Sequence, residues 1–310
     1  MVLTATNESV YLWPKFYQAF ANKLLEYKND RNALIVKLRR AYSSLKGLDF
    51  PKPDNNYELT DIDPFSVFAF FNCGLKSPNL DTLIRELAKE FGISEIDGSL
   101  NLSGVPSVNN VRRYFFYADS KTVNDDIDGL WSIFETAIQY ADADPSSKLK
   151  LRDEFVHRFN DVENAGENKS HDHKVGKILA MGLFWIRPYT FLSLDGRNCS
   201  YLKRNVDGFK NPKDLEGDEY LKTCDKVKAW LNDKGMKSFI ELTEKAREKS
   251  NENVEQDKID TTENEITEGD MNTCDDFLSD VYMTKDEAEK LKSLLLYKKN
   301  IILQGAPGVG

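Results

Sequence analysis

The sequence has few of the residues that hold disulfides or metals. Only four cysteines occur in 310 residues, far apart and without C-x-x-C spacing: Cys73, Cys199, Cys224 and Cys274. This pattern excludes a disulfide framework or a cysteine zinc site and is typical of reduced thiols. The three histidines, His157, His171 and His173, include two in a charged stretch. We therefore predict no metal site.

Long apolar runs are also missing. No segment approaches the roughly 18 consecutive apolar residues that a membrane span requires. The first residues show no basic stretch followed by a long apolar one, so we expect no signal peptide and no membrane contact. A cytoplasmic protein is the expectation from these two absences.

Negative charge is concentrated in one segment. Residues 250–280 contain eleven Asp or Glu and one Lys, a net charge of −10, while the whole chain carries −9. The remaining residues are therefore close to neutral, at +1. A neutral total neither favours nor excludes nucleic-acid binding, because a local basic patch can exist on a neutral protein.

Three regions follow from the composition. Residues 1–245 contain all four tryptophans and show apolar spacings of three and four, typical of amphipathic helices, with little strand-like alternation. Residues 246–276 have few large apolar side chains and many acidic ones, which predicts a disordered acidic linker. Residues 277–310 become apolar again. Helices are predicted over 16–27, 32–45, 80–91, 127–140, 148–159, 174–186, 218–231 and 238–249. A further helix is predicted in "DIDPFSVFAFFN", with Asp63 as its cap and Pro64 as its first residue.

The last residues contain half of a phosphate-binding loop. A capping box at Thr284 and Glu287 predicts a helix, and the apolar run at 301–303 predicts a short buried strand. The sequence then reads Gly305-Ala306-Pro307-Gly308-Val309-Gly310, the first six positions of G-x-x-x-x-G-K-[ST]. Backbone N–H groups of such a loop surround phosphates. The lysine that reaches the β- and γ-phosphates does not follow Gly310. We therefore expect a fragment that holds no nucleotide by itself and has no catalytic residues for its hydrolysis.

The segment "FLSDVYM", the following helix and "KKNIILQGAPGVG" resemble the start of the AAA+ domain of McrB-type proteins, the nucleotide-driven subunits of modification-dependent restriction systems. "DIDPFSVFAFFN" and "MGLFWIRPYTFLSLDGRNCSYL" are similar to the helical amino-terminal domain of such proteins. The resemblance implies an α/β P-loop domain beginning in 277–310, a hexameric ring, and hydrolysis of GTP or ATP with Mg²⁺. It also implies two partners: DNA, including DNA in methylated or otherwise modified form, and a separate endonuclease subunit. The nucleotide-binding residues it implies are Gly305, Ala306, Gly308, Val309 and Gly310, with Val281, Tyr282 and Met283 near the base.

Cations beside aromatic residues mark three candidate DNA-binding stretches, because cations contact phosphates and aromatic rings stack on bases. The first, "KLRRAY", contains Lys37, Arg39, Arg40 and Tyr42. The second contains Arg112, Arg113 and Tyr114. The third contains Arg187, Tyr189, Arg197, Asn198, Lys203 and Arg204, and Pro188 predicts that it forms a loop.

Two other functions stay open. The amino-terminal domain of an AAA+ ATPase can instead be a protein-interaction adaptor, for which scattered charges and a flat apolar patch are expected. A base-excising enzyme requires a buried carboxylate in an aromatic pocket, and Asp195 is the candidate acid. Clustering of the arginines and lysines on one face, beside a concave aromatic pocket, is expected for a DNA-binding domain.

Overall fold

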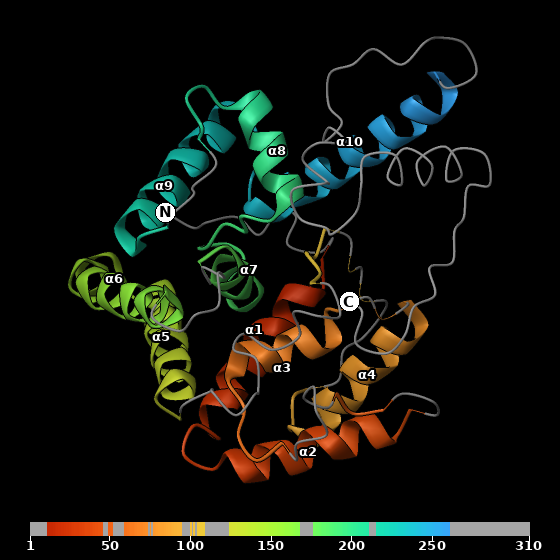
Figure 1. Ribbon diagram of the computed structural model, residues 1–310, viewed down its shortest axis with the longest axis vertical. Helices are drawn as coiled ribbons and strands as arrows, with labels where there is room; N and C mark the ends of the chain where they lie inside the picture. The colour runs from red at the N-terminus through yellow and green to blue at the C-terminus, as the bar shows by residue number, and fades with distance from the viewer. Residues whose placement is uncertain are drawn as a thin grey trace, which may run out of the picture. The chain divides into compact units, whose positions relative to one another are not determined.

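The computed structural model describes residues 11–45, 49–51, 59–73, 75, 77–94, 100, 102, 104–108, 124–167, 176–210 and 215–260. Over these ranges the chain is helical and contains no strand, which confirms the prediction of a mainly α amino-terminal domain (Figure 1). The described helices are α1 (Trp13–Leu25), α2 (Arg31–Ser43), α3 (Pro64–Phe71), α4 (Ser77–Glu90), α5 (Asn124–Asp142), α6 (Pro145–Glu167), α7 (Gly176–Ile186), α8 (Gly196–Asn205), α9 (Gly217–Asp233) and α10 (Phe239–Asp260). Among them, no helix has both the length and the apolar character needed to cross a bilayer.

The chain divides into two compact units, Met1–Val254 and Glu255–Gly310. The helices described below belong to the first unit. Of the second unit, only residues 255–260 at the end of α10 are described. The predicted helix, strand and phosphate loop of 277–310 lie outside the described residues.

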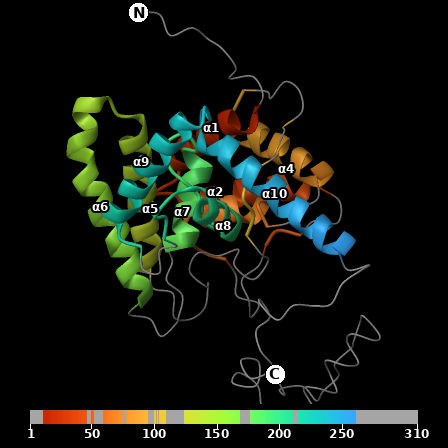
Figure 2. The same ribbon diagram turned by 90° about the horizontal axis from the view of Figure 1, so that it is seen from above.

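The centre of the first unit is built from α1, α3 and α7 (Figures 1 and 2). Every residue of α3 is buried. Its amino-terminus is capped as predicted: the Asp63 carboxylate accepts a hydrogen bond from the backbone N–H of Ser66 at 2.8 Å. Phe68 of α3 contacts Tyr17 of α1 and Trp185 of α7 through ring faces and edges. This aromatic packing fixes α7, and with it the chain that follows Ile186.

A second aromatic cluster positions that chain. Phe191 stacks on Phe155 of α6, and Tyr220 of α9 stacks on Phe159, with ring centroids 5.4 Å apart in both pairs. The Tyr220 hydroxyl donates a hydrogen bond to the carbonyl of Leu192 at 2.9 Å. The buried segment 191–194 is therefore held between α6 and α9, and it leads directly into α8.

The structure corrects the sequence prediction at α8. The chain from Arg187 to Arg204 was predicted to be a loop, yet Gly196–Asn205 is a helix. The helix was missed because Pro188 ends α7 and because α8 has few apolar residues. Its buried positions are Asn198, Cys199 and Leu202, a narrow stripe in an otherwise polar helix.

The beginning of the predicted linker is also different. The helix predicted over 238–249 overlaps the start of the linker predicted over 246–276, and α10 is helical over this overlap and continues to Asp260. The sequence from 239 to 260 contains neither Gly nor Pro and has many Glu, Lys and Arg residues, which favour a helix even without apolar packing. Residues 261–276 of the predicted linker lie outside the described residues.

Candidate functional site: a basic cavity between two helices

Asp195 starts α8 as its amino-terminal cap. One carboxylate oxygen, Oδ1, accepts hydrogen bonds from the backbone N–H groups of Arg197 at 3.0 Å and Asn198 at 3.2 Å. The other oxygen, Oδ2, accepts from the Ser193 hydroxyl and from the Asn198 side-chain amide, each at 2.8 Å. Capping removes unsatisfied donors at a helix start, which explains where α8 begins.

Asn198 connects α8 to α10. The side chain is fully buried, and its amide nitrogen lies 3.0 Å from the Ser193 carbonyl and 3.2 Å from the Thr243 hydroxyl of α10. Thr243 in turn donates to the carbonyl of Phe239 at 2.8 Å. The hydrogen bonds of this amide nitrogen therefore connect the start of α8 directly to α10.

Residues 104–107 form a third wall. The indole N–H of Trp185 donates to the carbonyl of Pro106 at 3.0 Å, which ties this segment to α7. Gly104 has a φ of +78°, and a Cβ atom there would lie 3.2 Å from the backbone nitrogen of Glu244. Only glycine allows both this backbone angle and this approach to α10.

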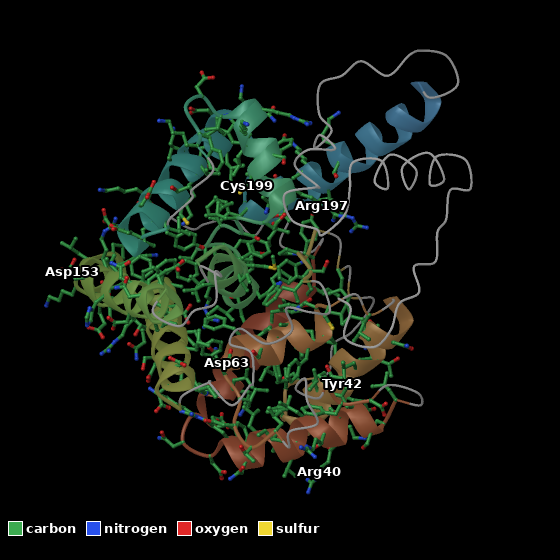
Figure 3. The ribbon with its side chains drawn as sticks, viewed as in Figure 1. Arg40, Tyr42, Asp63, Asp153, Arg197 and Cys199 are labelled. Atoms are coloured by element: carbon green, nitrogen blue, oxygen red, sulfur yellow. The ribbon has the colours of Figure 1, made fainter. Side chains whose placement is uncertain are left out.

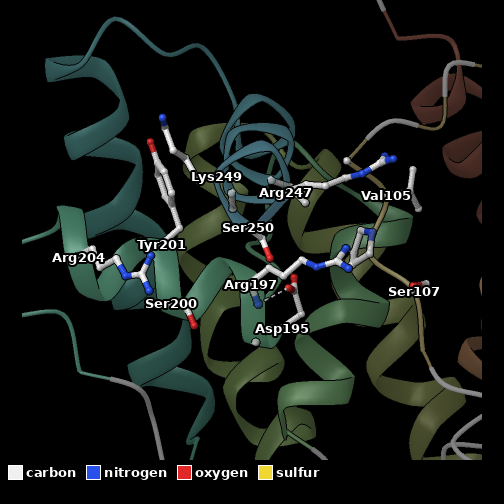
Figure 4. Close-up of a pocket in the computed structure, with 15 residues that line it drawn as sticks. Val105, Ser107, Asp195, Arg197, Ser200, Tyr201, Arg204, Arg247, Lys249 and Ser250 are labelled. Carbon is white, nitrogen blue, oxygen red and sulfur yellow. Dashed lines mark hydrogen bonds between the residues drawn. The ribbon is translucent and has the colours of Figure 1, made fainter. Parts of the chain in front are cut away.

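These three segments enclose a cavity of about 600 Å³, hereafter the basic cavity (Figure 4). Its lining residues are Gly104, Val105, Pro106, Ser107, Asp195, Gly196, Arg197, Ser200, Tyr201, Arg204, Thr243, Ala246, Arg247, Lys249 and Ser250. The lining thus contains four cationic side chains, one carboxylate and one aromatic ring. A volume of this size suits a ligand as large as a nucleotide.

Helical spacing brings the polar residues of the basic cavity together. On α8, Arg197, Ser200, Tyr201 and Arg204 stand at i, i+3, i+4 and i+7. On α10, Thr243, Ala246, Arg247 and Ser250 follow the same spacing. Residues so spaced share one face of a helix. The two helices therefore present matching faces to one space.

The three arginines of the basic cavity are electrostatically uncompensated. Within the described residues, the guanidinium groups of Arg197, Arg204 and Arg247 form no ion pair and no hydrogen bond, and all three side chains are exposed. Five other described arginines are engaged: Arg31 pairs with Asp61 and Asp128, Arg85 with Asp81, Arg152 with Asp218, Arg158 with Glu154 and Arg187 with Asp142. The one carboxylate in the lining, Asp195, already accepts four hydrogen bonds. The basic cavity is thus a place where an anion finds free donors.

The predicted DNA-binding residues separate into four groups: residues that line the basic cavity, residues exposed elsewhere, residues outside the described ranges, and buried residues. Arg197 and Arg204 line the basic cavity together, as expected for cations clustered on one face (Figure 4). Lys203 is exposed on α8 outside the lining, and Tyr189 is exposed in the turn after α7. Arg112, Arg113 and Tyr114 lie outside the described residues.

Two predicted DNA contacts are corrected by their burial. Arg187 is only 4% exposed. Its guanidinium donates to both carboxylate oxygens of Asp142, at 2.7 and 2.6 Å, and to the side-chain carbonyl of Asn22 at 2.7 Å. Asn198 is fully buried in the network described above. Both side chains hold the fold together and have no surface to offer to DNA.

The stretch "KLRRAY" on α2 forms no comparable site. Lys37 donates to the carbonyl of Glu90 at 2.5 Å, Arg39 lies over the ring of Phe50, and Tyr42 is buried. Arg40 remains exposed by itself, well separated from Arg197 in Figure 3.

The sequence reasoning missed Arg247, Lys249 and Tyr201. The acidic linker was predicted to begin at residue 246, at the end of the helix predicted over 238–249, and the two cations there were not among the predicted site residues. A signal was present, since Thr243, Arg247 and Ser250 have helical spacing and match the α8 residues. Their meeting depends on α8 and α10 crossing near Asn198, which no local pattern encodes.

The described residues contain no group of histidine, cysteine, aspartate and glutamate side chains that could hold a metal ion. Asp195 is only partly buried, and both of its carboxylate oxygens accept hydrogen bonds at the start of α8, which it caps. The sole carboxylate of the cavity lining is therefore a structural group. The predicted nucleotide-binding residues Val281, Tyr282, Met283, Gly305, Ala306, Gly308, Val309 and Gly310 lie outside the described residues.

Comparison with known proteins gives one match. A family model described as a domain of unknown function (DUF8425) matches residues 13–249. No curated protein and no solved structure matches the chain. The matched segment begins at the first residue of α1 and ends at Lys249, the last cation of the basic cavity. Because this segment covers well over half of the chain, the protein belongs to the DUF8425 family.

Proposed function

We propose that the helical domain binds nucleic acid, and specifically DNA, through the basic cavity. The observation that carries the proposal is the convergence of Arg197, Arg204 and Arg247 on one concave surface without carboxylate partners. Phosphate groups satisfy such cations, and the release of condensed counterions from DNA provides much of the binding free energy. A guanidinium group also donates two parallel hydrogen bonds to a phosphate, which favours arginine at such sites.

The shape of the basic cavity sets what enters it. A duplex is about 20 Å wide and stays outside, whereas a single nucleotide extruded from the duplex fits a space of about 600 Å³. Tyr201 supplies a ring on which such a base stacks, and arginines at both ends supply phosphate contacts. Recognition of a methylated or hydroxymethylated base fits this proposal, in keeping with the resemblance to modification-dependent restriction proteins.

The proposed setting is a McrB-like AAA+ nucleoside triphosphatase. Its support is the sequence from Gly305 to Gly310, which matches a phosphate loop, after a capped helix and an apolar run. In this proposal GTP or ATP with Mg²⁺ binds a complete P-loop domain that assembles as a hexameric ring. Hydrolysis in the ring moves DNA that the helical domain has recognised, and a separate endonuclease subunit cleaves it.

The alternatives receive less support. An adaptor domain needs an apolar docking patch, but the exposed large hydrophobic residues of the described chain, Val36, Leu149 and Tyr189, lie on three separate elements. A base-excising enzyme needs a free acid in the basic cavity, and Asp195 is committed to capping α8.

DNA binding by the full chain tests the proposal. We would compare matched methylated, hydroxymethylated and unmodified duplexes at several salt concentrations. Arg204→Gln is expected to weaken binding and to reduce the slope of log K against log salt by about 0.9, since it removes one phosphate contact. Arg40→Gln is the matched control, because Arg40 is also exposed on a helix but lies on α2, and its slope is expected to equal that of the wild type.

The possible results of the DNA-binding experiment lead to different conclusions. Affinity that depends on the modification supports a reader of modified bases. Equal affinity for all duplexes, with a steep salt dependence, supports a domain that follows the phosphate backbone. Absence of binding at low salt, or equal effects of the two substitutions, refutes DNA binding at the basic cavity.

A further inference from the structure

We propose that an anion bound in the basic cavity bridges α8 and α10 and thereby stabilises the part of α10 that leads out of the domain. This inference rests on the proposed function, because it takes DNA phosphates as the natural ligand. It goes beyond that function by assigning to the same site the regulation of a helix. The starting observation is that the walls of the basic cavity belong to two helices with different anchoring.

The first half of α10 is firmly anchored. Phe239, Ile240, Leu242, Thr243 and Ala246 are all at least 94% buried. Thr243 is also tied to Asn198 of α8 by a hydrogen bond. These contacts fix the helix as far as Ala246.

Anchoring ends where the cations begin. After Ala246, residues 247–249 are exposed and Ser250 is half-buried. Arg247 and Lys249 thus extend from the first turn that the hydrophobic core no longer holds. The helix nevertheless continues through Val254, the last residue of the first unit, to Asp260.

Within the described residues, the guanidinium group of Arg247 forms no ion pair with a carboxylate. Glu244 accepts a hydrogen bond from the Tyr11 hydroxyl. Burial, this bond and the nearby charges of Glu241 and Glu248 all raise the pKa of Tyr11. The spacing of the three glutamates, 241, 244 and 248, places them together on the face toward Tyr11. The face toward α8 keeps its positive charge.

Two like-charged helix faces therefore meet across the basic cavity. In Figure 4, Arg197 of α8 and Arg247 of α10 extend to the same side, toward Val105 and Ser107. Tyr201 and Lys249 extend together at the other side. Without an anion, the unpaired guanidinium groups of Arg197 and Arg247 repel each other. A phosphate between Arg197 and Arg247 replaces this repulsion by charge-assisted hydrogen bonds from both helices.

A physical coupling follows from this arrangement. A ligand that needs α10 folded against α8 suppresses every opening of α10 that breaks the site. The stabilised turns, 247–254, come directly before the segment that runs toward the phosphate loop at residues 305–310. Occupancy of the DNA site is thereby transmitted into the chain that joins it to the proposed motor.

Hydrogen exchange of the full chain tests this inference, with a short DNA duplex and with tripolyphosphate as separate probes. At about 100 times the Kd of the probe, exchange of the 247–254 amides by local opening is expected to slow by as much as about 100-fold. Amides of α2 serve as the internal control and are expected to be unchanged. In Arg247→Gln, saturating probe is expected to give no added protection of 247–254. In Arg40→Gln, which changes an exposed arginine of α2 outside the basic cavity, the added protection is expected to equal that of the wild type.

The outcomes separate this inference from the proposed function. If tripolyphosphate protects α10 while DNA does not bind, the bridge is supported and DNA recognition is refuted. If DNA binds at saturation and the exchange of 247–254 is unchanged, DNA recognition stands and the bridge is overturned. Equal protection of wild type and Arg247→Gln also overturns the bridge, as does failure of both probes to bind at low salt.

Discussion

Arg187 and Arg197 are ten residues apart in the sequence, and the structure gives them opposite surroundings. Both were predicted to contact DNA. Arg187 is buried in a network of hydrogen bonds, whereas Arg197 is exposed in the basic cavity without an ion pair. Replacing each by methionine, which keeps most of the aliphatic stem, separates stability from DNA binding.

The expected magnitude for Arg187→Met comes from its contacts. The substitution removes two hydrogen bonds to Asp142, one to Asn22 and one to the carbonyl of Ile186 at 2.7 Å. Removing one partner of a buried ion pair costs about 3–5 kcal/mol. Asp142 is 52% exposed and regains water, which reduces the cost. We therefore expect a loss of about 3 kcal/mol in the free energy of unfolding.

Arg197→Met is expected to behave in the opposite way. Its side chain is exposed and has no ion pair, so the free energy of unfolding should change by less than about 0.5 kcal/mol. Affinity for DNA should fall, and the slope of log K against log salt should decrease by about 0.9. Arg187→Met, measured under conditions where it is folded, should retain wild-type affinity and slope.

Urea unfolding followed by tryptophan fluorescence gives the stabilities, and fluorescence anisotropy with labelled DNA gives the affinities. Binding should be measured at low temperature, where Arg187→Met is still folded by circular dichroism. A stable Arg187→Met with weakened DNA binding would refute the assignment of Arg187 to the core. A destabilised Arg197→Met with unchanged DNA binding would refute the assignment of Arg197 to the site.

Three further outcomes are expected. Burial raises the pKa of Asp63 from its ordinary 3.8 to about 6, against the opposing effect of hydrogen bonds from Ser66, so the protonated form is favoured in the folded state. The stability that Asp63 contributes is therefore present below about pH 4 and lost as the pH rises through 6. Relative to Asp63→Asn, the free energy of unfolding of the wild type, measured by urea unfolding, should fall by up to about 3 kcal/mol between pH 4 and 7. Parallel pH profiles of the two proteins would contradict this. Asn198→Leu should destabilise by about 2–3 kcal/mol, since the Thr243 and Ser193 acceptors lose a buried donor, and a thermal midpoint equal to that of the wild type would argue against the network. Gly217→Ala should lower the free energy of unfolding by about 1–3 kcal/mol, because its Cβ would lie 3.0 Å from the Cα of Val156. The Cβ of Gly196→Ala would meet nothing within 4 Å, so this variant should be neutral or slightly more stable than the wild type. If calorimetry finds Gly196→Ala less stable than Gly217→Ala, the close approach of α6 and α9 is misassigned.

Several helices were predictable because their signals are local. Apolar residues at spacings of three and four predicted α1 and α5, and the pair Asp63–Pro64 predicted where α3 begins. Capping and amphipathic spacing act within a few residues, so the sequence contains all that is needed. The polar helix α8 has the same kind of cap at Asp195, but its narrow buried stripe was too weak a signal against Pro188.

The site was predictable only in part. Arginines near aromatic residues drew attention to the stretch from Arg187 to Arg204, yet spacing along the chain does not show which of them point outward. Burial decides this: Arg187 turns inward to Asp142, and Asn198 turns inward to Thr243. Arg247 was not among the predicted site residues; it stands at the end of the helix predicted over 238–249, where the acidic linker was predicted to begin.

The sequence by itself determined the mainly helical fold, the acidic segment, and the likeness of Gly305–Gly310 to a phosphate loop. It also gave the expectation that the protein has no metal site and no disulfide framework. These depend on composition and on patterns within about ten residues. Only the tertiary structure decided that Arg197 and Arg204 meet Arg247 around one cavity. Residues 204 and 247 are brought together by the crossing of α8 and α10 at Asn198, and such a long-range contact depends on the packing of the whole core.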